Sequence, residues 1–224
     1  MMAPEPVSSP ATLAGQAGSR GQPTVQRVDR IRAEATIALL HRLRVSLLGI
    51  HSRRLHSVLV TDGVGGRIDC RIACQAEQVA GVVLAAPASY WRWLVLGHWG
   101  IAFECVRARS RARGGSPKAA PRLSQDALAL LENEPAPRTW KAPGDAWRII
   151  FVGTAPEARG KGIAAQLYRS IMADRSLVAR IALDNTASIR LHHSVGWQLF
   201  RDGDVALAVH LRRSGQQVAE KGTT

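Results

Sequence analysis

The chain has 224 residues, 46% of them hydrophobic and 21% charged, which is enough apolar material for one packed domain with extensions. Thirty Lys and Arg against 17 Asp and Glu give a formal net charge of +13. This favours a nucleic acid, an acidic membrane or a phosphate-bearing cofactor as partner, or else reflects a basic surface with no specific partner. The three cysteines, without a CxxC pair, argue against a disulfide framework and for a reducing compartment, so a cytoplasmic location is expected.

Both ends of the chain have a composition typical of disorder. Residues 1–27 are rich in Pro, Gly, Ser and Ala and are predicted to be a disordered leader without the pattern of a signal peptide. Residues 214–224 are predicted to be a disordered tail. The longest apolar passage, 91–106, contains charged residues and is too short for a membrane span. A single domain is therefore expected over 28–213.

The first part of this domain combines helices and strands. Leu and Ile recur with helical spacing through residues 30–60, which predicts two helices interrupted around Gly49. Residues 67–75 and 78–87 follow a cluster of turn residues and are rich in β-branched and apolar side chains. They are predicted to be two strands joined by a tight turn.

The second part begins with an insertion and continues with regular alternation. Residues 88–146 are predicted to be a helical and loop insertion with a linker, including a short helix at 125–132. From Trp147 onward the expected elements are a strand at 147–154, a helix at 161–175, a strand at 178–183, a helix at 185–194 and a closing hairpin at 197–213.

A glycine-rich turn, GTAPEARGKG, leads from the strand 147–154 into the next helix. This order of elements points backbone N–H groups at a negatively charged ligand. A triphosphate-binding loop requires GxxxxGK[ST], but the chain has Ala155 at the first glycine and Gly162 at the Ser or Thr. That class of site is excluded.

A dinucleotide-binding fingerprint is a closer formal match. Gly160, Gly162 and Ala165 satisfy GxGxxA, and Asp184 ends the next strand, where the ribose-binding acid should lie. However, TAPEAR separates the strand from the first glycine, and only about forty residues follow Asp184, too few for the large parallel sheet of that fold.

The third interpretation fits best. The run Arg159-Gly160-Lys161-Gly162-Ile163-Ala164 resembles the acyl-CoA signature [QR]xxGx[GA] of the GNAT superfamily of N-acetyltransferases, in which loop and helix wrap the coenzyme A pyrophosphate. Glycines let the backbone approach the phosphates, and the helix dipole adds positive potential. The lead-in APEARGKG is also similar to the family's pattern.

A second motif lies in register with the first. The family's Asn-x-x-Ala-x-x-Leu-Tyr followed by Gly-Phe resembles the stretch from Asn185 through Leu191 and His192 to Gly196 and Trp197. Weaker similarity covers residues 46–87. The resemblance implies an α+β fold with a mixed, mostly antiparallel central sheet flanked by helices, and an insertion between the third and fourth strands.

The resemblance also implies a function. The expected activity is N-acetyltransfer from acetyl-CoA to a primary amine of a small molecule by direct attack, with no metal. Two alternatives stay open, a protein lysine or N-terminal acetyltransferase and a non-catalytic acyl-CoA-binding module.

Further site residues follow from the family's pattern. Backbone N–H groups of Val152, Gly153 and Thr154 are expected to meet the acyl carbonyl and the pantetheine. Asn185 is expected to hydrogen-bond the cofactor, and it can also be a helix N-cap.

The acid and base candidates depart from that pattern. His192 stands where the family usually has the Tyr that protonates the leaving thiolate, so it is either the general acid or the filling of a polar pocket. Asp145 is the nearest carboxylate to the fourth strand and is a weak base candidate. It can also be a turn residue, with water carrying the proton.

The insertion is expected to flank the amine acceptor. It carries Tyr90, Trp91, Trp93, His98, Trp99 and Phe103, followed by Arg107, Arg109, Arg111 and Arg113. These residues can contact a sugar nucleotide, a membrane surface or a nucleic acid, or the aromatic side can simply pack on the sheet. No nucleic-acid-binding motif is seen, and nucleic acid is not an expected partner. The positive charge favours an acceptor with a phosphate or carboxylate over a free polyamine, and the oligomeric state is left open.

Overall fold

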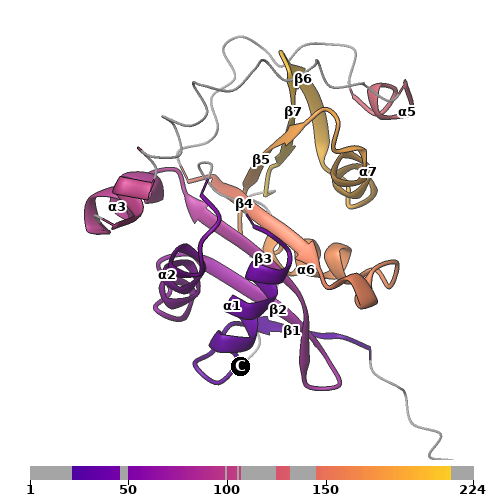
Figure 1. Cartoon of the computed structure of the whole chain (residues 1–224). Coiled ribbons are helices and arrows are strands. Elements are labelled where there is room, and N and C mark those ends of the chain that lie inside the picture. The colour runs from indigo at the N-terminus through magenta and orange to yellow at the C-terminus, as the bar shows by residue number, and fades with distance from the viewer. Residues whose placement is uncertain are drawn as a thin grey trace, which may run out of the picture.

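The computed structural model describes residues 22–45, 50–98, 100–104, 106, 125–131 and 145–212. Within these ranges the chain forms a seven-stranded sheet of order β1-β2-β3-β4-β5-β7-β6 with helices on both faces (Figure 1). Neighbouring strands are antiparallel except β4 and β5, which are parallel. The predicted fold class is thereby confirmed. The strands are β1 Thr24–Arg27, β2 Asp69–Gln75, β3 Gln78–Pro87, β4 Trp147–Thr154, β5 Leu177–Ala182, β6 Gln198–Asp202 and β7 Val205–His210.

Strand β1 lies inside the segment 1–27 that was predicted to be a disordered leader. Its residues pair antiparallel with β2, and Val25 packs against the core. The prediction was wrong for this strand because a short edge strand is stabilised by its neighbour rather than by its own composition. Residues 1–21 and the predicted tail lie outside the described residues.

The helices form a layer on each face of the sheet. They are α1 Ala33–Arg42, α2 Arg53–Val64, α3 Tyr90–Gly97, α5 Gln125–Leu128, α6 Ile163–Met172 and α7 Thr186–Ser194. Cys70 lies against Gly63 of α2, whereas the next residue, Arg71, bonds to Ser170 of α6. Because successive strand residues point to opposite faces, α2 and α6 cover opposite sides of the sheet. No described helix is both long enough and apolar enough to cross a membrane.

The insertion between β3 and β4 begins with α3. The hydroxyl of Tyr90 donates a 2.6 Å hydrogen bond to the buried carboxylate of Asp62, which fastens the start of α3 to α2. Residues 100–104 are also helical, and α5 is shorter than the predicted helix at 125–132. Residues 99, 105, 107–124 and 132–144 of the predicted insertion lie outside the described residues, as does the predicted break around Gly49.

Candidate active site

The glycine-rich turn between β4 and α6 has the backbone geometry of an anion-binding loop. Gly160 and Gly162 have φ angles of +76° and +73°, which glycine adopts without steric cost. Gly162 is the N-cap of α6 and has no side chain, so the first N–H groups of the helix are not capped by it. A β-carbon at either glycine would meet no atom within 4 Å. The turn therefore fits a negatively charged group.

The other residues of the predicted loop divide by burial. Arg159 and Lys161 are exposed, and the Lys161 Nζ lies 3.4 Å from the Gln75 side-chain oxygen. Ile163 is 1% exposed and packs against β3, where a β-carbon on Gly81 would lie 2.8 Å from the Ile163 Cγ2. Ile163 therefore holds the start of α6 against the sheet. Like Gly162, which has no side chain, it can contact a ligand only through its backbone. Ala164 is half-buried.

Strand β4 contains one residue more than the facing part of β3. Ala85 pairs with Ile149 and Leu84 with Phe151, so Ile150 has no partner on β3. Such a β-bulge bends the strand and reverses which of its backbone groups face each neighbour.

The reversal decides which of the three predicted backbone residues face β5. The Ala155 N–H donates to the Ala80 carbonyl at 2.8 Å, toward β3. Because backbone groups alternate along a strand, Val152 and Thr154 present their N–H and C=O groups to the β5 side. Gly153 presents its groups to β3. The prediction named all three equally, but only two have backbone groups available on that side.

Strands β4 and β5 pair over a short distance and then separate. The parallel register contains Trp147 opposite Leu177 and Arg148 opposite Val178, and both strands continue without further pairing. We call the facing unpaired edges beyond these positions the β4–β5 opening. Its backbone groups are available to hydrogen-bond an extended ligand.

Asn185 stands just beyond the carboxyl end of β5, at the start of α7. Its side-chain oxygen accepts the N–H of Ser188 at 3.1 Å, which confirms the N-cap prediction. The residue is exposed. A cofactor contact is therefore sterically open and stays a prediction.

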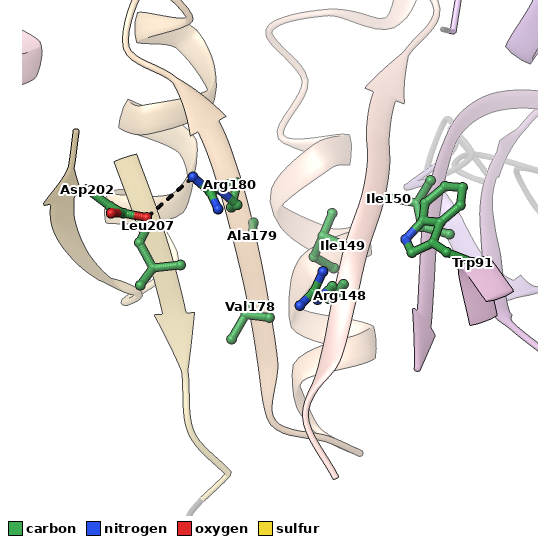
Figure 2. Close-up of a pocket in the computed structure, with 9 residues that line it drawn as sticks. All are labelled: Trp91, Arg148, Ile149, Ile150, Val178, Ala179, Arg180, Asp202 and Leu207. Atoms are coloured by element: carbon green, nitrogen blue, oxygen red, sulfur yellow. Dashed lines mark ion pairs between the residues drawn. The ribbon is translucent and has the colours of Figure 1, made fainter. Parts of the chain in front are cut away.

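A cavity of about 370 Å³ lies on the sheet face opposite α6 and α7, beside the β4–β5 opening (Figure 2). Ala179 and Ile181 of β5 pack with residues of α6 and α7, so Val178 and Arg180 point to the other face. Figure 2 shows Arg148 between β4 and β5. The lining residues are Trp91, Arg148, Ile149, Ile150, Val178, Ala179, Arg180, Asp202 and Leu207.

His192 lies in the core between α6 and α7 and is 1% exposed. Its Nδ1 is 2.7 Å from the Ser188 carbonyl, which can only accept, so Nδ1 carries the proton. Its Nε2 then accepts the hydroxyl hydrogen of Tyr168 at 2.8 Å. Burial lowers the pKa of His192 to about 4, although the bond to Ser188 opposes this shift, so the ring is neutral near neutral pH.

This arrangement agrees with the interpretation of His192 as a residue that fills a polar pocket. Both ring nitrogens have protein partners, and no proton of His192 points to the β4–β5 opening. The geometry counts against the predicted role as general acid, because a proton donor must lie within hydrogen-bonding reach of the reacting atom.

Asp145 is exposed in the turn that precedes β4. It lies at the amino end of that strand, whereas the available backbone groups of Val152 and Thr154 lie toward its carboxyl end. The nine residues from Asp145 to Thr154 span roughly 30 Å of extended chain. This distance counts against the predicted role of Asp145 as base and agrees with the turn interpretation.

Three charged residues of the cavity were not singled out from the sequence. Arg148, Arg180 and Asp202 come from three different strands. A signal was present for the two arginines, because each interrupts an otherwise apolar strand. Trp91, by contrast, was among the aromatic residues expected near the acceptor.

The comparisons with known proteins agree with this geometry. Residues 127–197 match the model of the acetyltransferase (GNAT) family. No curated protein matches the chain. NAA60 from Arabidopsis thaliana, solved in complex with acetyl-CoA, is 15% identical with a TM-score of 0.51, covering 85% of this chain and 100% of NAA60. The yncA protein from Salmonella typhimurium, solved with its cofactor acetyl-CoA, is 13% identical with a TM-score of 0.50, covering 90% of this chain and 99% of yncA.

At these identities the two solved structures bear on the fold alone. The family match bears on the site, because the matched segment contains β4, the glycine-rich turn, α6, β5 and α7. The segment that builds the anion-binding turn and the β4–β5 opening is thus the segment that matches the acetyltransferase (GNAT) family model.

Proposed function

We propose that the protein is an N-acetyltransferase that transfers the acetyl group of acetyl-CoA to the primary amine of a small molecule by direct attack. The observation that carries the proposal is the uncapped glycine turn at the start of α6, beside two parallel strands that separate. The family match supports the activity, and the acetyl-CoA in the two similar solved structures supports the donor.

The residues of the turn fit the pyrophosphate of the donor. Gly160 and Gly162 let the backbone present its N–H groups, and the exposed Arg159 and Lys161 add positive charge. Bound acetyl-CoA supplies an activated thioester carbonyl and a thiolate leaving group. Val152 and Thr154 orient the extended arm along β4, and their N–H groups can polarise the carbonyl. Asn185 is placed to bond the donor at the far side of the opening.

The acceptor reaches the β4–β5 opening through the cavity on the opposite face. The backbone positions the two reactants, which by itself lowers the barrier by restricting their relative motion. Neither His192 nor Asp145 is placed to move a proton there. The amine therefore enters as its free base or passes its proton to water.

Two other functions make different predictions. A protein acetyltransferase would acetylate a lysine or N-terminal peptide in preference to small amines. A non-catalytic acyl-CoA-binding module would bind acetyl-CoA without releasing coenzyme A in the presence of any amine. The cavity volume of about 370 Å³ favours the small-molecule acceptor, because it matches the size of a small-ligand site.

Calorimetric titration with acetyl-CoA, run beside NAD, tests the proposal. We expect micromolar binding of acetyl-CoA, no binding of NAD, and a loss of at least about ten-fold in acetyl-CoA affinity in the double variant Arg159→Ala/Gly162→Asp. Gly203→Asp is the matched control, because Gly203 also has a positive φ, of +64°, and open surroundings but lies in the β6–β7 turn.

Equal loss in the control, or a preference for NAD, would contradict the assignment of the turn. Release of coenzyme A with a panel of amines then separates an enzyme from a binding module. Comparison of small amines with lysine and N-terminal peptides separates the two acceptor classes.

A further inference from the structure

The charges that line the cavity do not cancel. The guanidinium of Arg180 lies 3.4 Å from the carboxylate of Asp202, and both side chains are exposed. Arg148 has no ion pair with any residue in the described part of the chain. One positive charge therefore remains uncompensated among the lining residues.

Arg148 stands at the inner end of the β4–β5 opening. It occupies the last paired position of β4, opposite Val178, and only Ile149 separates it from the bulged Ile150. Val152, whose N–H is expected to meet the acetyl carbonyl, lies two residues beyond Ile150, roughly 13 Å from Arg148 along the strand. A group that binds the long side chain of Arg148 is thus held at the same β4–β5 opening as the acetyl group.

Arg148 is exposed, so a ligand can reach its guanidinium directly. The cavity also has apolar residues, Trp91, Ile150, Val178 and Leu207, which can contact the carbon atoms of a ligand. A planar guanidinium in such a place binds a carboxylate or phosphate through two parallel hydrogen bonds, which a neutral group cannot reproduce.

We propose that Arg148 makes the enzyme selective for acceptors that carry an anionic group, carboxylate or phosphate, a few bonds from the reacting amine. The inference rests on the proposed function, because it assumes that the cavity receives the acceptor. It also implies discrimination against diamines, whose second ammonium group would lie beside the positive guanidinium of Arg148. Arg148 acts by binding and orienting the acceptor and takes no part in the proton transfer.

Two matched pairs of probes test the selectivity. β-Alanine and propylamine differ by a carboxylate, and phosphoethanolamine and ethanolamine differ by a phosphate. Each is titrated into the coenzyme A complex of the wild type, of Arg148→Gln and of Arg30→Gln. Arg30 is an exposed arginine outside the cavity and serves as the matched control. Thermal unfolding of each variant establishes that it is folded.

We expect the wild type and Arg30→Gln to bind at least one anionic amine about ten-fold or more tightly than its neutral partner. Arg148→Gln should lose this preference and bind the neutral amine unchanged. The pair that shows the preference distinguishes carboxylate from phosphate. Absence of any preference in the wild type, absence of binding by all four probes, or a preference that persists in Arg148→Gln would overturn the inference.

Release of coenzyme A from acetyl-CoA, measured with the same probes, separates this inference from the proposed function. If the wild type shows the Arg148-dependent preference in binding but releases no coenzyme A with any amine, the proposed function is wrong and the anion site stands. If it acetylates both members of each pair with equal kcat/KM, the function stands and the anion site is wrong.

Discussion

At the scale of single residues, His192 shows how burial removes a side chain from acid–base chemistry. Its ring lies between those of Tyr168 and Trp197, with centroids 4.7 Å and 4.8 Å away. The fold lowers its pKa from 6.5 to about 4, chiefly by desolvation. Because the folded value lies below the unfolded value, the stability associated with the neutral ring is present above pH 6.5 and is lost as the pH falls toward 4.

We expect the wild type to lose up to about 3 kcal/mol of unfolding free energy through His192 between these pH values, and His192→Gln to lose much less over the same range. Turnover per folded molecule near neutral pH should fall by less than about ten-fold in this variant, against a hundred-fold or more for a lost general acid. Urea unfolding at a series of pH values and coenzyme A release measure the two quantities. The exposed neighbour His193, changed to Gln, is the control. A large loss of turnover with unchanged stability would restore the catalytic role.

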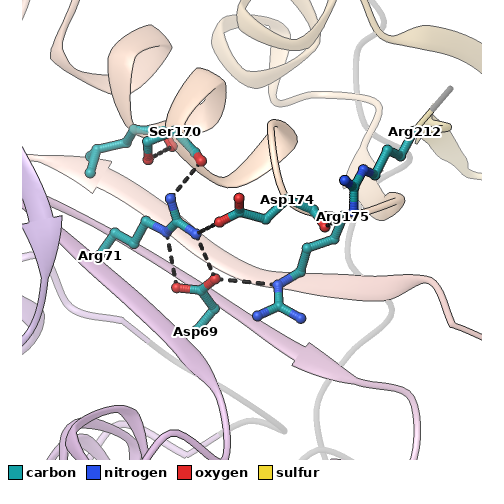
Figure 3. Close-up of polar contacts among 7 residues, drawn as sticks. Asp69, Arg71, Ser170, Asp174, Arg175 and Arg212 are labelled. Atoms are coloured by element: carbon teal, nitrogen blue, oxygen red, sulfur yellow. Dashed lines mark hydrogen bonds and ion pairs between the residues drawn. The ribbon is translucent and has the colours of Figure 1, made fainter. Parts of the chain in front are cut away.

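At the scale of elements, a buried ion-pair network fastens α6 to the sheet (Figure 3). The side chain of Asp69 on β2 is fully buried and accepts two hydrogen bonds of 3.0 Å from Arg71. Arg175, just after α6, lies 3.3 Å from the same carboxylate. Arg71 also bonds to the Ser170 carbonyl and to the carboxylate of Asp174. The network holds the carboxyl end of the helix whose amino end forms the anion-binding turn.

The network also sets the charge of Asp69. Burial alone would raise the pKa of this carboxyl, but the hydrogen bonds and charge of Arg71, with the charge of Arg175, outweigh it and lower the pKa below 3.8. A lowered folded pKa means that the carboxylate stabilises the fold above pH 3.8, and that this contribution is lost as the pH falls further.

We expect Asp69→Asn to reduce the free energy of unfolding by about 3 kcal/mol or more, because it removes the buried carboxylate shared by Arg71 and Arg175 and leaves Arg71, among the described residues, only the half-exposed carboxylate of Asp174. The substitution Glu34→Gln breaks the Glu34–Arg53 pair, which is 3.0 Å long but exposed, and should cost less than about 1 kcal/mol. Urea unfolding at neutral pH measures both. Equal effects of the two substitutions would mean that the network does not fasten α6. Below pH 3.8 the difference between wild type and Asp69→Asn should shrink.

At the scale of the whole molecule, exposed apolar side chains gather on one segment. Trp93, Leu96, Phe103 and Val106 form what we call the insertion patch, and all are exposed. Trp93 and Leu96 share one side of α3, whose buried side carries Tyr90 and Leu94. Packing on the core therefore explains the buried Tyr90 but not the exposed Trp93 and Phe103. In sequence the patch is followed by four arginines at alternate positions, in a chain of net charge +13.

Aromatic side chains beside clustered arginines favour an anionic lipid surface. We expect the protein to sediment with phosphatidylserine vesicles and not with neutral phosphatidylcholine vesicles, and the double variant Trp93→Ser/Phe103→Ser to lose most of this binding. Ile31→Ser is the control, because Ile31 is equally exposed but lies outside the patch. Binding that the double variant retains in full would place the contact elsewhere, and absence of binding would remove the membrane interpretation. A cytoplasmic location stays a prediction from the sequence.

The sequence by itself determined the order of the elements from α1 to β7 and the turn at Gly160 and Gly162. These features depend on neighbouring residues, because helical spacing, strand alternation and a positive φ are local properties of the chain. Two motifs in register gave the resemblance to the GNAT family, whose model matches residues 127–197, and the N-cap role of Asn185 followed from its position before a helix.

Only the tertiary structure decided the rest. The edge strand β1, the bulge at Ile150 and the separation of β4 from β5 depend on strands that are distant in sequence. The same holds for the burial of His192 between α6 and α7, which favours the polar-pocket interpretation over the general-acid role. The charge of the cavity was also undecided by the sequence, because only the sheet brings Arg148, Arg180 and Asp202 together and pairs Asp202 with Arg180. Local pattern specifies which element forms, and packing specifies what each side chain meets.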